Sequence, residues 1–177
     1  MANASTTINA PLSPAKAWTP YQIGIVSLLF LAMVIGYMDR VNFSVVVPTL
    51  LKEYDLSPKT AGWLLSIFNW ALALAYLFSG PLIDRFHARR VLPTGVAVWS
   101  FATFMAGLSA TVPVLGAART LLGLGESTLI PSASKLVSEL FPKDQQGKAI
   151  GCYFSGTKVG LTIGTPLAAA ILAAWGW

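Results

Sequence analysis

The sequence has few charged residues, one cysteine and one histidine. Only 11% of its 177 residues are charged, whereas 55% are hydrophobic and the mean hydropathy is +0.65. Soluble domains usually carry about 25% charged residues, so this composition excludes an ordinary soluble domain and is typical of a membrane protein. Cys152 has no partner for an internal disulfide, and we interpret it as a small buried hydrophobic residue.

The patterns that carry enzyme chemistry are missing as well. The chain has no His/Cys/Asp spacing typical of a metal site and no nucleophile–histidine arrangement. It also has no glycine-rich phosphate loop. These absences argue against an enzyme and predict no metal or cofactor. The pI of about 9.6 does not indicate nucleic-acid binding, because the basic residues are scattered without a basic face.

Long apolar runs are abundant instead. A membrane span needs about 20 apolar residues, because the hydrocarbon core is about 30 Å thick and each helical residue rises about 1.5 Å. The runs predict an all-α membrane protein whose five spanning helices cover about 21–47, 61–83, 91–110, 114–140 and 147–174. The first helix is expected to end at Pro48, because proline removes a helical hydrogen bond.

The polar segments predict orientation. Residues 1–20 are rich in proline, serine and threonine, so we expect a disordered tail rather than a cleaved signal. By the positive-inside rule, the tail and the basic segments 84–90 and 142–148 are expected in the cytoplasm. The fifth helix then ends outside, where 175–177 (Trp-Gly-Trp) is expected to be an interfacial anchor.

Four charged residues interrupt the apolar runs, namely Asp39 and Arg40 in the first and Arg119 and Glu126 in the fourth. Near the centre of a spanning helix each costs roughly 2.5–3.5 kcal/mol, so together they cost on the order of 10 kcal/mol. A chain keeps such charges when they pair or serve a polar pathway. They make transport the leading functional hypothesis.

Counting residues estimates where these charges lie. Arg40 and Arg119 fall at similar heights, roughly 12 Å and 9 Å from the outer ends of their helices. Glu126 follows Arg119 by two helical turns, so both side chains are expected on one face, with Glu126 about 10 Å deeper. Asp39 is expected to point about 100° away from Arg40, toward another helix.

These residue types suit proton-coupled transport of an anion. Arginine binds a carboxylate through parallel N–H groups. Burial raises the pKa of a carboxyl and a nearby arginine lowers it, so a balanced group can take up a proton on one side and release it on the other. The alternative is that Asp39–Arg40 or Arg119–Glu126 are structural pairs. Tyr37 lies at the charged depth, either as a substrate contact or as a packing aromatic.

The fifth run carries a further deep charge beside small residues. Gly156, Gly160 and Gly164 recur at four-residue spacing, which lets a neighbouring helix approach closely. Lys158 lies on the opposite side of that helix. It is expected to face a cavity, or a carboxylate such as Glu126, as a substrate contact or a structural partner.

Several segments are similar to motifs of a known family. Residues 80–90 (GPLIDRFHARR) resemble the G-x-L-x-D-R-x-G-x-[RK]-[RK] loop signature of the major facilitator superfamily, with His87 in the place of a glycine. Residues 37–44, with Asp-Arg-x-Asn, and 119–126, with Arg-x-x-x-Gly-x-x-Glu, resemble helices one and four of its anion:cation symporter family. Phe-Pro followed by glycine within 141–147 is similar to its next cytoplasmic loop, although Gln-Gln replaces the usual Glu-Arg there.

The resemblance implies most of the N-terminal six-helix bundle of a twelve-helix symporter, in which an organic anion such as a sugar acid, hexuronate or tartrate crosses the inner membrane with a proton by alternating access. With the depth argument, the predicted substrate-binding residues are Arg40, Arg119, Tyr37 and Lys158. The predicted proton-coupling residues are Asp39 and Glu126. The loop motif expected to make cytoplasmic contacts during alternating access is Gly80, Asp84, Arg85, Arg89 and Arg90.

A second hypothesis stays open, because the chain stops after an odd number of predicted spans. It is that the chain is a transport-inactive membrane fragment, or a split-gene product that needs the missing helices. The expected partners are the organic anion, the proton, the lipid bilayer and the missing C-terminal bundle, with no nucleic acid.

Overall fold

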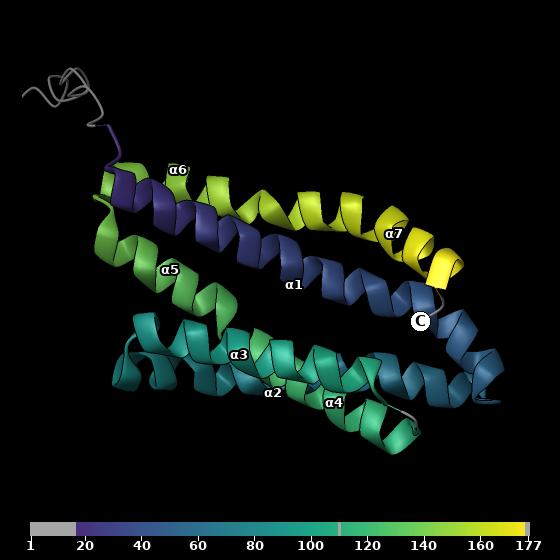
Figure 1. Ribbon diagram of the computed structural model, residues 1–177. Helices are drawn as coiled ribbons and strands as arrows, with labels where there is room; N and C mark the ends of the chain where they lie inside the picture. The colour runs from purple at the N-terminus through teal and green to yellow at the C-terminus, as the bar shows by residue number, and fades with distance from the viewer. Residues whose placement is uncertain (1–16, 110, 176–177) are drawn as a thin grey trace, which may run out of the picture.

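The computed structural model describes residues 17–109 and 111–175, and every regular element in these ranges is an α-helix (Figure 1). The elements are α1 (Pro20–Glu53), α2 (Pro58–Phe86), α3 (Ala88–Gly107), α4 (Val112–Glu126), α5 (Leu129–Leu140), α6 (Lys143–Phe154) and α7 (Gly156–Trp175). α1 lies beside α6 and α7 in one layer, and α2, α3 and α4 form another (Figure 1). The all-α fold is as predicted.

Three stretches of the described chain are long and apolar enough to cross a membrane. They are Pro20–Glu53, Pro58–Phe86, and Lys143–Trp175 when α6 and α7 are taken together. The N-terminal end of α1, the α2–α3 connection and the α5–α6 connection lie at the same end of the bundle (Figure 1). The start of α1 and the two basic segments predicted to be cytoplasmic are therefore on one side.

Helix α1 begins with a reciprocal cap. The Thr19 side chain accepts a hydrogen bond from the Gln22 N–H, and the Gln22 side chain accepts one from the Thr19 N–H. The Trp18 ring packs edge-on against Phe141, with centroids 5.1 Å apart. Residues 1–16 of the predicted tail lie outside the described residues. Within the described part of that segment, Trp18 packs on the bundle.

Helix α1 also continues past the proline that was expected to end it. It runs through Pro48 to Glu53, and Leu50 beyond the proline is buried in a cluster with Phe43 and Leu64. Proline removes one hydrogen bond, but ending the helix inside an apolar bundle would expose more unpaired backbone groups. The burial of Leu50 further favours the continued helix.

The fourth and fifth runs are each divided by a turn, which the sequence did not predict. Ser127 and Thr128 separate α4 from α5, and Ser155 separates α6 from α7. Their hydroxyls donate to carbonyl oxygens three residues earlier, at 2.7, 3.0 and 2.7 Å. Such bonds compete with the helical pattern. Helix α6 begins at Lys143 rather than at 147, directly after Pro142, which is its N-cap and has an extended backbone.

The predicted stripe of small residues is the face on which α7 packs against α1. A Cβ added to Gly156 would lie 2.5 Å from the Phe30 carbonyl oxygen, and one added to Gly160 would overlap the carbonyl oxygen of Val34. A Cβ added to Gly164, one turn further on, would lie 3.2 Å from Met38 Cα, a less severe contact. The close helix approach is confirmed.

Candidate functional site

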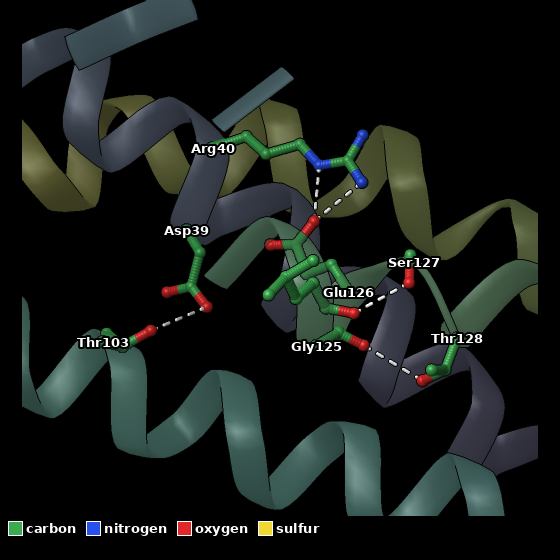
Figure 2. Close-up of polar contacts among 8 residues, drawn as sticks. Asp39, Arg40, Thr103, Gly125, Glu126, Ser127 and Thr128 are labelled. Atoms are coloured by element: carbon green, nitrogen blue, oxygen red, sulfur yellow. Dashed lines mark hydrogen bonds and ion pairs between the residues drawn. The ribbon is translucent and has the colours of Figure 1, made fainter. Parts of the chain in front are cut away.

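An ion pair joins the two layers near the centre of the bundle. Arg40 on α1 donates from Nη2 and Nε to one oxygen of Glu126 on α4, Oε2, at 2.7 and 2.9 Å (Figure 2). The Glu126 side chain is fully buried, whereas that of Arg40 is 26% exposed. Glu126 Oε1 is buried and has no hydrogen-bond partner among the described residues. Neither structural pair considered from the sequence, Asp39–Arg40 or Arg119–Glu126, is formed within the described chain.

Arg119 is a buried cation held by aromatic rings. It is 4% exposed, and its guanidinium carbon lies 3.9 Å from the ring centroid of Phe43 and 4.7 Å from that of Phe68. Within the described chain it forms no ion pair, and its Nε has no hydrogen-bond partner. Cation–π contacts are worth about 2 kcal/mol when desolvated, but they leave the N–H donors unsatisfied. This is an environment suited to an anion.

The two arginines share one aromatic ring. The guanidinium carbon of Arg40 lies 5.6 Å from the Phe68 centroid, and that of Arg119 lies 4.7 Å from it. The Tyr37 ring also contacts Arg40, at 4.7 Å. The similar heights estimated for the two guanidinium groups agree with this arrangement. Phe68, which the sequence analysis did not single out, contacts both cations.

Asp39 turns away from Arg40 toward α3, as its position on the helix predicts. Its Oδ2 accepts a long hydrogen bond of 3.5 Å from the Thr103 hydroxyl (Figure 2). A cavity of about 240 Å³ opens beside it, with Asp39, Asn42, Thr103 and Arg119 as its polar lining and apolar side chains of α1, α3, α4 and α7 around them. Thr103 was missed in the sequence, where its only signal was a hydroxyl in an apolar run.

Two residues of the fifth run lie differently from expectation. Lys158 is exposed, and the carboxylate that was considered as its partner, Glu126, pairs with Arg40 instead. The stripe of glycines faces α1, so the opposite side of α7, where Lys158 lies, points out of the described bundle. Cys152 is exposed rather than buried as expected. Helix α6 contacts the bundle through another face, which carries Ala149 and Tyr153.

The loop motif lies at the α2–α3 connection. Asp84 Oδ1 lies 3.3 Å from Lys135 Nζ in an exposed ion pair. His87 has φ 67° and ψ 139°, a left-handed conformation that favours glycine, and it stands where the loop signature has glycine. The remaining motif residues, Gly80, Arg85, Arg89 and Arg90, are exposed.

Residues 29–177 match the sequence profile of the Major Facilitator Superfamily. The chain belongs to this superfamily. It is 33% identical over 150 residues to the probable L-galactonate transporter of Escherichia coli (strain K12), covering 85% of this chain and 33% of that protein. It is 30% identical over 175 residues to the chloroplastic ascorbate transporter of Arabidopsis thaliana, covering 96% and 32%. The superfamily predicted from the loop motif is confirmed.

The fold is similar to that of a transporter of known structure. A bacterial homologue to the human lysosomal transporter Spinster, in an inward-facing and unoccupied conformation, superimposes with a TM-score of 0.80 and 25% identity, over 88% of this chain and 33% of that one. The chain therefore spans about a third of the length of the relatives it matches.

Proposed function

We propose that the chain supplies most of the N-terminal bundle of a secondary transporter that carries an organic anion together with a proton by alternating access. The relatives named as transporters of ascorbate and L-galactonate support a sugar acid or a similar carboxylate as the substrate. The basic segments gathered at one end of the bundle support a cytoplasmic N-terminus in a multi-pass protein of the inner membrane (Figure 1).

The observation that carries this proposal is the buried guanidinium of Arg119, which has no ion pair within the described chain. An unpaired buried charge is costly, so a binding anion relieves the cost that the empty site bears. Arg40, which is partly exposed, offers a second guanidinium that contacts the same Phe68 ring. Two further residues complete the proposed substrate contacts. Tyr37 lies against Arg40, and Lys158 lies on the exposed face of α7.

Proton coupling follows from competition for Arg40. A proton added to Oε1 of Glu126 neutralises the carboxylate that holds Arg40 through Oε2. Arg40 is then free to bind the substrate carboxylate, so the proton and the anion bind together. Loss of the proton restores the Arg40–Glu126 pair and releases the anion. Asp39 lines the same cavity as Arg119, so its carboxylate competes with the substrate for Arg119 in the same way.

A second candidate is a membrane fragment that does not transport alone. The chain covers about a third of its relatives, and α2 exposes large apolar side chains, with Trp63 at 63%, Trp70 at 66% and Phe78 at 70%. Lipid or further helices would cover such a face. Substrate flux into proteoliposomes containing only this chain would overturn this candidate. A reading frame that continues past codon 177, or an adjacent gene for the remaining helices, would favour the first candidate, the anion–proton transporter.

Uptake by the complete transporter tests the proposed substrate site. Across a panel of labelled sugar acids, Arg40→Ala and Arg119→Ala should each abolish uptake while the protein remains in the membrane. Lys59→Ala, at an exposed cation near the start of α2, should leave uptake unchanged. Unchanged uptake by either arginine variant would refute the assigned role.

A further inference from the structure

A second hollow lies on the α2–α4 layer, away from the charged centre. Helix α4 packs extensively against both α2 and α3, whereas α2 and α3 contact each other much less. A groove of about 470 Å³ therefore opens between α2 and α3, with α4 as its floor. Its apolar walls include Leu82 and Phe86 of α2, Val91 and Val98 of α3, and Leu121 and Leu124 of α4.

Among the polar side chains that line the groove, only Arg90 is available to bind a ligand. The Thr94 hydroxyl donates to the carbonyl of Arg90, and the Thr128 hydroxyl donates to that of Gly125, at 2.9 and 3.0 Å. Both are satisfied within their own segments. Arg90 lines the groove at one end only and is exposed. The groove thus combines an apolar trough with a single cationic end.

The cationic end coincides with a helix terminus that has no side-chain cap. His87 at the N-cap of α3 makes no side-chain capping bond, so the positive end of the helix dipole is open. Within the described chain, Arg89 and Arg90 form no ion pair, and Asp84 of the same connection is paired with Lys135. An anion at this point meets Arg90 and the helix terminus together.

We propose that this groove binds an anionic phospholipid, with the phosphate at Arg90 and one acyl chain along the trough. From Arg90 to Val98 the trough follows α3 for eight residues, about 12 Å, which leads inward from the membrane surface. Phe86 and Leu124, two of its lining residues, are 48% and 45% exposed, so they present hydrocarbon to a lipid tail. Basic pockets between spanning helices on the cytoplasmic side are suited to anionic headgroups.

Photo-crosslinking in a bilayer tests the site. The complete transporter is reconstituted in nanodiscs with a trace of phosphatidylglycerol carrying a diazirine in its acyl chain, or with the matched phosphatidylcholine. Mass spectrometry then locates the adducts. Phosphatidylglycerol should label peptides that contain Val98, Leu121 or Leu124 at least fivefold more than phosphatidylcholine does.

Variants separate headgroup recognition from general lipid contact. Arg90→Gln should reduce the phosphatidylglycerol adducts to the phosphatidylcholine level, whereas Lys143→Gln, an exposed cation at the same end of the bundle, should not. Leu124→Trp, which fills the groove, should remove the adducts of both lipids. Equal labelling by both lipids, or an Arg90→Gln variant labelled like wild type, would overturn the proposal. An absence of adducts from these peptides would also overturn the proposal, because it would mean that another part of the transporter covers the groove.

Discussion

Arg40 and Glu126 lie 86 residues apart in the sequence, and both hydrogen bonds from the arginine end on one carboxylate oxygen. The pair links the α1–α7 layer to the α2–α4 layer (Figure 1), and its Glu126 side chain is fully buried. The second oxygen of Glu126 is buried without a partner in the described chain. The same contact can therefore hold the bundle together and respond to a proton.

Removing one member of this pair should cost more than removing both. Arg40→Met leaves the buried Glu126 without its partner, which we expect to lower the free energy of unfolding by about 3–5 kcal/mol. The double variant Arg40→Met/Glu126→Leu should recover most of that loss, because no charge is left uncompensated. Unfolding in mixed micelles of increasing denaturing detergent measures both. Losses that simply add would show that the ion pair contributes nothing of its own.

The contact between α1 and α7 should be intolerant of a single methyl group. Gly160→Ala places a Cβ against the Val34 carbonyl, so we expect the free energy of unfolding to fall by about 1–3 kcal/mol. Gly151→Ala on α6 is the matched control, because no heavy atom lies within 4 Å of its Cβ position. There, the better helix propensity of alanine should give no loss or a gain of up to about 1 kcal/mol. Equal effects at the two sites would contradict the close packing.

Replacing His87 by glycine should relieve backbone strain in the α2–α3 connection. His87 holds φ 67° and ψ 139°, a conformation that costs a side chain about 1–3 kcal/mol. His87→Gly should raise the free energy of unfolding by about 1 kcal/mol after the loss of chain entropy, whereas His87→Ala should not change it. Thermal unfolding of the purified variants measures the difference. A glycine variant no more stable than the alanine variant would mean that the backbone is unstrained.

The sequence predicted the features that depend on position along one helix. Apolar runs are long because the bilayer is thick, so the membrane-protein class and the helical fold follow from composition. The four-residue spacing of Gly156, Gly160 and Gly164 places them on one face, and that face is the one packed on α1. The turn of Asp39 away from Arg40 follows from the same geometry.

Features that depend on how helices are rotated against one another were beyond the sequence. Counting residues gives a height for Glu126 but no direction toward a neighbour, so its pairing with Arg40 rather than Arg119 or Lys158 was not predicted. The contact of Phe68 with both arginines depends on how α2 packs against α1 and α4, which the sequence does not give. The continuation of α1 beyond Pro48 depends on tertiary burial that local propensity does not contain.

Glu126→Gln in proteoliposomes containing the complete transporter tests the coupling of proton to anion most directly. Glutamine cannot take up a proton, so Arg40 is no longer held by a charge that a proton can remove. The variant should retain counterflow exchange of the substrate between equal concentrations, and it should lose accumulation driven by an imposed pH gradient. Accumulation at the wild-type level in this variant would contradict the proposed role of Glu126.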